Sequence, residues 1–162
     1  MSRTDYTITH RKVTTDKPFE DVRLAFESQL GPVDEQPYTD LSAGADAQEI
    51  RVRLEKIPGS SGMTNFHCYD HGALLRIKGL DRKALSYVVG NSLIAIEMTQ
   101  FSLDAAVHLP FRLELYVDEA GKTVFAYDLP SSILKRFADP RIDETGAMLD
   151  SKVAAVIEKS IH

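Results

Sequence analysis

The sequence has 162 residues, of which 43% are apolar and 27% are charged, a composition typical of one folded domain and not of a disordered chain. Its 24 acidic against 19 basic residues give a formal net charge of -5, which argues against a nucleic-acid partner. A single cysteine excludes an internal disulfide and a multi-cysteine zinc cluster. No apolar run approaches the ~18 residues of a membrane span and the first residues lack a signal-peptide core, so we expect a cytoplasmic protein with no membrane partner.

The first predicted elements are a strand and a helix. Aromatic and aliphatic residues alternate with threonines over residues 5–14, which predicts a strand. Pro18 suits the first turn of a helix, where its missing N–H costs no hydrogen bond. Apolar residues at helical spacing then continue as far as Leu30, and Gly31-Pro32 ends the helix.

Residues 31–62 differ from the rest in composition, because they hold three of the seven prolines and four of the nine glycines. Asp46 begins a pattern typical of a capped helix, and apolar residues at helical spacing follow as far as Ile57. Alternation in the same stretch leaves a strand as the second possibility. We interpret residues 31–62 as an insertion into a single domain of residues 1–162, with one short helix between two flexible connections. Tyr38 and Leu41 are the side chains that it could bury.

The rest of the chain predicts four strands and two helices. The strands are expected at residues 64–71, 85–89, 111–118 and 123–128, and the helices at residues 92–100 and 144–160. The last two strands flank a turn that ends at Gly121, so they form an antiparallel hairpin. The order of elements predicts an α+β domain: a mixed, mostly antiparallel sheet with helices packed against it, ending in an amphipathic C-terminal helix.

Four short motifs occur in an order that resembles the domain-of-unknown-function family 302 (DUF302). A His-Gly pair follows a strand at His71-Gly72, and a Gly-Asn turn precedes a helix at Gly90-Asn91. A hairpin starts with a Leu-Pro-x-Arg motif at Leu109-Pro110 with Arg112, and it ends with a Tyr-Asp-x-Pro motif at Tyr127-Asp128 with Pro130. The family pattern has a proline where this chain has Ser92. The serine has a backbone N–H that proline lacks, and its φ angle is not fixed by a ring. The resemblance runs from about Pro18 to the C-terminus without the insertion. It implies a compact α+β domain, often dimeric, and no particular activity.

His71 is the first catalytic candidate. It ends a predicted strand next to Gly72, where a ligand can approach the backbone closely, and histidine titrates near neutral pH. Glu97, on the helix after Gly90-Asn91, is its expected acid partner for proton transfer. The alternative is that His71 only bonds the backbone at the strand end and Glu97 is solvated.

A metal site is not expected, although His67, Cys68, Asp70 and His71 crowd into one strand. Residues i and i+4 of a strand share a face but lie roughly 13 Å apart at ~3.3 Å per residue. His67 and His71 therefore could not hold one zinc ion, whose bonds to nitrogen are ~2.0–2.1 Å long. Cys68 is expected to be a buried, unreactive thiol.

Asn91 and Ser92 are ligand candidates because they open a helix after a strand, a place where free N–H groups can bind an anion. The alternative is that Asn91 caps the helix with its side-chain oxygen. Met98, with Met63, Phe66 and Phe101, could line an apolar pocket for a small hydrophobic ligand, haem included. Core packing explains the same side chains more economically.

Arg112 and Tyr116 are ligand candidates on the predicted hairpin, where they share the face opposite Leu113 and Leu115. Arg112 could hold a carboxylate through two hydrogen bonds, or could form an ion pair within the sheet.

We expect a homodimeric domain that binds a small hydrophobic or anionic molecule beside His71 and the helix after Gly90-Asn91. An enzyme that uses His71 and Glu97, and a dimerisation module without a ligand, are the alternatives. The sequence identifies no cofactor.

Overall fold

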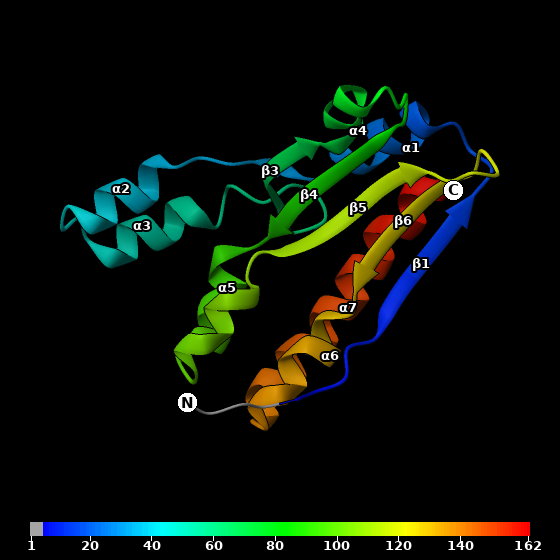
Figure 1. Cartoon of the computed structure of the whole chain (residues 1–162). Helices are drawn as coiled ribbons and strands as arrows, with labels where there is room; N and C mark the ends of the chain where they lie inside the picture. Colours follow the sequence, from blue (N-terminus) through cyan, green and yellow to red (C-terminus); the bar gives the residue numbers. More distant parts are fainter. Residues whose placement is uncertain (1–4) are drawn as a thin grey trace.

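The computed structural model describes residues 5–162, which form one twisted sheet with helices packed against it (Figure 1). The six strands lie in the order β1-β6-β5-β4-β3-β2. Neighbouring strands are antiparallel, except that β2 runs parallel to β3. Their bounds are β1 (His10–Thr15), β2 (Gly31–Pro32), β3 (Thr64–Asp70), β4 (Ala84–Gly90), β5 (Phe111–Val117) and β6 (Thr123–Asp128). The predicted α+β fold with a mixed, mostly antiparallel sheet is confirmed.

The helices differ in what they cover. Their bounds are α1 (Phe19–Glu27), α2 (Gln36–Ser42), α3 (Ala47–Leu54), α4 (His71–Leu75), α5 (Ser92–Thr99), α6 (Pro130–Leu134) and α7 (Pro140–Ile161), with short 3-10 turns η1 (Arg76–Lys78), η2 (Leu103–His108) and η3 (Lys135–Phe137). Helices α1 and α7 lie behind the strands in Figure 1 and pack on one face of the sheet. None of the helices in residues 5–162 is long and apolar enough to cross a membrane.

The main core lies between this face and the two helices. Phe26 of α1 is 1% exposed, and its ring lies 5.0 Å from the ring of Tyr87 and 5.3 Å from that of Phe125. Each aromatic side chain buried in this way contributes roughly 1.5–3 kcal/mol. The hydroxyl of Tyr87 also donates a hydrogen bond to Glu27 at 2.7 Å, which ties α1 to β4. A second, smaller apolar cluster joins α5, η2, α6 and α7.

Strict alternation in β5 places its two sets of side chains on opposite faces. Phe111, Leu113 and Leu115 are buried under α1 and α7. The residues between them point to the other face of the sheet, which is turned toward the viewer in Figure 1.

Several element boundaries differ from those predicted. β1 begins at His10 because only residues from His10 onward pair with β6, so the predicted start at residue 5 was wrong. α7 begins at Pro140 and not at residue 144, since Asp139 caps it by accepting from the N–H of Arg141. Helix α6 was not predicted.

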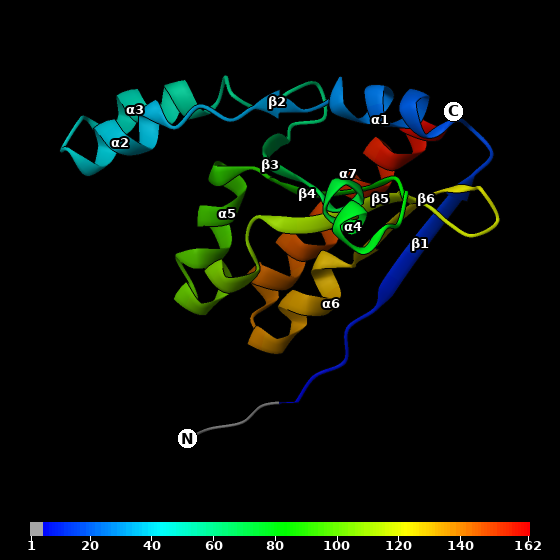
Figure 2. The same cartoon turned by 45° about the horizontal axis from the view of Figure 1, so that its top comes forward.

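Residues 33–57, the α2–α3 arm, project from the end of the sheet beside β3 (Figures 1 and 2). The prediction of one helix between flexible connections was wrong, because the arm contains two helices and its base is tied by hydrogen bonds. The N–H groups of Gly31 and Gly59 both donate to the carbonyl of Met63, at 2.9 and 3.0 Å. Ser61 donates to the carbonyl of Gln29 through its N–H at 3.1 Å and through its hydroxyl at 2.7 Å. These bonds fix where the arm leaves the core.

Candidate functional site

His71 and Glu97, expected to transfer protons together, lie at opposite ends of the β3–β4 pair. His71 follows the end of β3 and Glu97 lies on α5, which follows the end of β4. Because the two strands are antiparallel, their ends are separated by about 20 Å at ~3.3 Å per residue. Both side chains are exposed, and the Glu97 carboxylate accepts a hydrogen bond from Gln100 at 3.0 Å. The expected pairing is therefore corrected, because proton transfer requires contact or one bridging water.

Arg112 and Tyr116 lie on the outer face of β5, opposite the side chains that enter the core. Arg112 is exposed and forms no ion pair with any residue from 5 to 162, so the expected ion pair within the sheet is absent from the described chain. Asp128, one of its expected partners, instead accepts a hydrogen bond from His10 at 2.8 Å. The structure does not bring Arg112 or Tyr116 to the site described below.

His67 and Cys68 of β3 and His71 at the start of α4 do not converge on one point. Tyr69 lies between the two histidines, with its ring 4.2 Å from that of His67 and 6.4 Å from that of His71. Over residues 5–162 no three His, Cys, Asp or Glu side chains are grouped so that they could hold a metal ion. Burial raises the pKa of the half-buried Cys68 thiol, which keeps it protonated and weakly nucleophilic at neutral pH.

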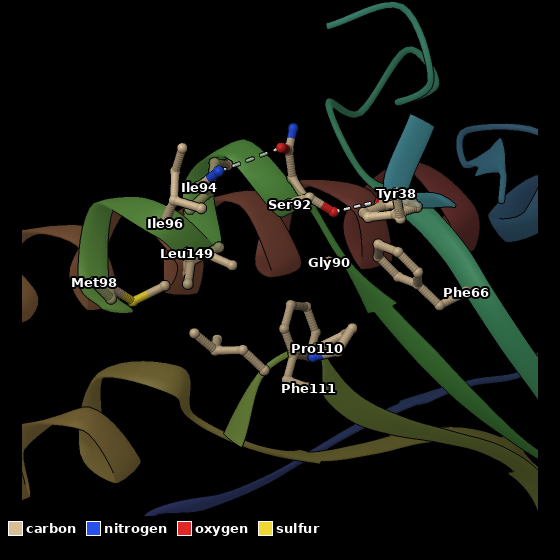
Figure 3. A pocket seen from close by; sticks show the side chains of 13 residues that line it. Tyr38, Phe66, Gly90, Ser92, Ile94, Ile96, Met98, Pro110, Phe111 and Leu149 are labelled. Atoms are coloured by element: carbon tan, nitrogen blue, oxygen red, sulfur yellow. Dashed lines mark hydrogen bonds between the residues drawn. The ribbon is translucent and has the colours of Figure 1, made fainter. Parts of the chain in front are cut away.

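A cavity of about 360 Å³ lies between the start of α5 and the start of β5 (Figure 3). Its walls come from six elements, α2, β3, β4, α5, β5 and α7. They join the two apolar clusters, with Met98 and Leu149 from the smaller one and Phe111 from the main core. The lining residues are Tyr38, Phe66, Gly90, Asn91, Ser92, Ile94, Ala95, Ile96, Met98, Leu109, Pro110, Phe111 and Leu149. Its size falls within the range of small-molecule sites, ~300–1,000 Å³.

Two hydroxyl groups form the polar side of the cavity. Tyr38 of α2 reaches across from the arm, and its hydroxyl lies 2.6 Å from that of Ser92 (Figure 3). One hydroxyl donates to the other, so the pair still has one hydrogen to donate and free lone pairs to accept with. A ligand could therefore bind this pair through an oxygen atom.

Asn91 and Gly90 build the end of the cavity beside α5. The side-chain oxygen of Asn91 accepts from the N–H groups of Leu93 at 2.9 Å and Ile94 at 3.3 Å, so it caps α5. Its amide nitrogen donates to the carbonyl of Gly62 at 3.0 Å. At Gly90 an added Cβ would lie 3.1 Å from the Cβ of Pro110, so glycine allows this close contact between strands.

None of the lining residues is an Asp, Glu, Lys, Arg or His. Two of the first N–H groups of α5, those of Leu93 and Ile94, could attract an anion but are already bonded to Asn91. The cavity thus offers an apolar surface, one pair of hydroxyls and no compensating charge.

Some of the residues expected to bind a ligand lie together around the cavity, and others do not. Asn91, Ser92 and Met98 line the cavity together with Phe66, and Tyr38 comes from the predicted insertion. Met63 is instead buried in the main core, and Phe101 packs under the guanidinium of Arg141 at 3.6 Å. Leu109-Pro110 and Leu149 also line the cavity, although they were not predicted as site residues. The Leu-Pro motif could have indicated Leu109-Pro110 as part of a site. No motif in the neighbouring sequence distinguishes Leu149 from other apolar residues of its helix.

Comparison with known proteins identifies the family and the fold. Residues 38–160 match the family model described as "Domain of unknown function DUF302", a range that begins within α2 and includes α3. No curated protein matches the chain. The crystal structure of an uncharacterized conserved DUF302 protein from Bacillus stearothermophilus is 18% identical, with a TM-score of 0.65 over 93% of this chain and 97% of that one. The family match covers most of the sequence, and the chain therefore belongs to the DUF302 family.

Proposed function

We propose that this protein binds a small, uncharged, mainly apolar molecule in the cavity beside α5. The observation that supports the proposal is an apolar cavity of about 360 Å³ whose polar side is a single pair of hydroxyls. A liquid water occupies ~30 Å³, so the cavity could hold about a dozen waters or a compact organic molecule. Apolar walls with a few placed polar groups are the usual composition of such sites.

The absence of charge among the lining residues favours a neutral ligand over an anionic one. An ionised carboxylate moved into this cavity would lose part of its hydration without gaining a cationic partner. The start of α5 offers little compensation, since Asn91 already occupies the N–H groups of Leu93 and Ile94. Of the two ligand classes expected from the sequence, we therefore retain the small hydrophobic molecule.

The hydroxyl pair gives the ligand an orientation. A phenol, alcohol or ketone could place its oxygen against Tyr38 and Ser92 and its carbon skeleton among Ile94, Met98 and Phe111. Such a hydrogen bond contributes about 0.5–1.5 kcal/mol, so burial of the carbon skeleton supplies most of the affinity.

Isothermal titration calorimetry with 2-naphthol and 2-naphthoate tests the proposal, because the two probes share a ring system and differ in charge at neutral pH. We expect 2-naphthol to bind at least about tenfold more tightly than 2-naphthoate, equivalent to about 1.4 kcal/mol. Tighter binding of 2-naphthoate would contradict the neutral class, and binding of neither probe would contradict the site.

A matched pair of variants locates the binding. Ala95→Phe fills the cavity from α5, whereas Ala147→Phe places the same ring on the exposed side of α7. We expect the first variant to abolish 2-naphthol binding and the second to leave it unchanged. Equal affinities in the two variants would place the ligand elsewhere.

A further inference from the structure

The chain between β3 and β4 forms a small projection, and residues 74–83 of it, which include η1, are called the tip below. From Arg76 to Lys83 every residue is exposed. Figure 1 shows this segment at the end of the β3–β4 pair that lies far from α5, so it is remote from the cavity. What the tip binds is therefore independent of the ligand proposed for the cavity.

Apolar side chains gather on the surface of the tip. Leu74 is 56% exposed, Ile77 81% and Leu80 46%. Leu74 and Ile77 are three positions apart across α4 and η1, a spacing that places side chains on the same side of a helical turn. Single exposed apolar residues are ordinary, but three large ones on one short projection are typical of an interaction surface.

Basic side chains surround these apolar ones. The tip has four basic residues and one acidic residue, a net charge of +3 in a chain whose net charge is -5: Arg76, Lys78, Arg82 and Lys83 against Asp81. Within residues 5–162 none of the four basic residues forms an ion pair. The Nζ atom of Lys83 lies 5.6 Å from the centre of the Phe19 ring, and the other three basic side chains have no such ring contact in the described chain.

The acidic groups next to the tip are bonded to other parts of the molecule. Asp70 accepts from an N–H group of α4 at 2.7 Å, and Glu20 pairs with an arginine of its own helix at 2.8 Å. Asp16 and Asp118 both bond Lys122. None of these carboxylates pairs with a basic side chain of the tip, so the positive charge of the tip remains available to an anionic partner.

The backbone holds the tip in shape. Gly79 has a φ of 71°, and its N–H donates to the carbonyl of Arg76 at 2.9 Å. At the base of the projection, an added Cβ on Gly72 would lie 2.3 Å from the carbonyl oxygen of Arg82, so the two ends of the segment are in contact. A partner therefore meets a surface that is already formed, and binding requires little ordering of the chain.

We propose that the tip binds the surface of an anionic lipid bilayer, with Ile77 in the interfacial region and the basic side chains against lipid phosphates. Apolar side chains surrounded by basic ones are typical of segments that bind such surfaces. A stable protein interface engages ~20–30 residues a side, and the tip has far fewer. This contact replaces the expectation of no membrane partner, which followed from the lack of a spanning segment.

The charge of the rest of the molecule would orient it on the bilayer. The α2–α3 arm has six acidic and three basic side chains, and it precedes β3 whereas the tip follows that strand. An anionic surface attracts the tip and repels the arm. The molecule therefore docks by the end of the β3–β4 pair that carries the tip, and the cavity stays outside the contact.

Vesicle flotation of the full chain tests the proposal, with vesicles of phosphatidylcholine alone and of phosphatidylcholine with about one-third phosphatidylserine. We expect the parent to bind the mixed vesicles at least about tenfold more strongly, and to lose this preference as salt is added, because salt screens exposed charges. Arg76→Gln/Lys78→Gln should bind the mixed vesicles at least about tenfold more weakly, since each basic side chain contributes about fivefold.

A matched control removes the same charge from another exposed part of the chain. Arg11→Gln/Lys12→Gln lies on β1, at the edge of the sheet opposite to β2 and β3. We expect this variant to bind the mixed vesicles as the parent does. Far-ultraviolet circular dichroism verifies that both variants are folded.

Fluorescence locates the contact within the molecule. The chain contains no tryptophan, so Ile77→Trp introduces a single reporter at the tip. Leu103→Trp places the same reporter on η2, where the leucine is 83% exposed and an acidic residue follows it. We expect the mixed vesicles to shift the emission of Ile77→Trp to shorter wavelength, because the ring enters the interfacial region, and to leave that of Leu103→Trp unchanged.

Several results would overturn the proposal. They are a parent that binds neither kind of vesicle or both alike, an equal loss of binding in the β1 control, and an emission shift in Leu103→Trp in place of Ile77→Trp. A parent that ignores the vesicles and binds polyglutamate would assign the tip to an acidic protein instead. Titration with 2-naphthol reads the cavity separately, so the failure of one site does not imply the failure of the other.

Discussion

Asn91 holds two parts of the molecule together through one side chain. Its oxygen caps α5 and its nitrogen bonds the carbonyl of Gly62, at the base of the arm. We predict that Asn91→Ala lowers the free energy of unfolding by about 2 kcal/mol, since a cap contributes ~1 kcal/mol and a further hydrogen bond about the same. Asn91→Ser keeps an N-cap oxygen and loses only the bond to Gly62, so urea titration should show about half the loss. Equal losses in both variants would contradict the capping role.

His108 gives the molecule a dependence on pH that its surroundings explain. Its Nε2 atom is buried and has no hydrogen-bond partner in the described chain. Burial lowers the pKa of His108 below its ordinary value of 6.5, and the nearby Arg136 lowers it further. The unfolded chain therefore binds a proton at His108 more readily than the folded chain does.

It follows that the contribution of His108 to stability is complete above pH 6.5 and is lost as the pH falls from there toward the lower folded pKa. We predict that the free energy of unfolding decreases less steeply below pH 6.5 in His108→Gln than in the parent. Urea titrations at several pH values between about 5 and 8 measure how steeply the free energy of unfolding changes with pH in the variant and in the parent. The difference between the two slopes is the contribution of His108. Parallel curves would show that His108 titrates alike in both states.

At the scale of elements, two glycines determine where the arm begins. An added Cβ on Gly59 would lie 2.5 Å from the carbonyl oxygen of Gln29, and one on Gly31 would lie 1.8 Å from that of Ile57. The chain segments that enter and leave the arm therefore cross with their backbones in direct contact. Backbone atoms cannot move aside as the end of a flexible side chain can, so only glycine fits at these two positions.

We predict that Gly59→Ala destabilises the protein by roughly 1–3 kcal/mol, because the backbones must separate to admit the methyl group. Ser60→Ala, an exposed neighbour in the same loop, is the control and should change stability by less than about 0.5 kcal/mol. Thermal unfolding followed by circular dichroism compares the two. A tolerated Gly59→Ala would mean that the arm is attached more loosely than these contacts indicate.

The contrast between β5 and the arm shows how far the sequence alone could predict the elements. Residues 111–117 alternate strictly, so one local pattern predicted both the strand and its buried face. In α2, by contrast, only Pro37 is buried, and no apolar stripe revealed that helix. The crossing at Gly31 and Gly59 joins residues far apart in the chain, so it could not be read from local composition.

In the candidate site, too, features set by neighbouring residues were predictable and contacts between distant residues were not. Asn91 follows a strand and precedes an apolar helix, and its capping role was predictable from that position. The hydroxyl pair was not, because Tyr38 and Ser92 are 54 positions apart. His71 and Glu97 were placed together only because both follow strands, and the antiparallel register separates them.

At the scale of the whole molecule, the arm and the cavity meet in α2. This helix belongs to the arm, and it carries Tyr38, whose hydroxyl completes the polar side of the cavity. The hydrogen bonds that hold the base of the arm therefore also help to hold Tyr38 in the position that a ligand requires. Ordering a group before its ligand arrives removes part of the entropic cost of binding.

We predict that the attachment of the arm and ligand binding are coupled. Gly59→Ala leaves every cavity residue intact, yet calorimetry should show that it binds 2-naphthol about three- to tenfold more weakly than the parent does, because the displaced arm carries Tyr38. Ser60→Ala is the control and should bind 2-naphthol as the parent does. Equal affinities in Gly59→Ala and the parent would mean that Tyr38 is ordered by its bond to Ser92 alone, with no contribution from the base of the arm.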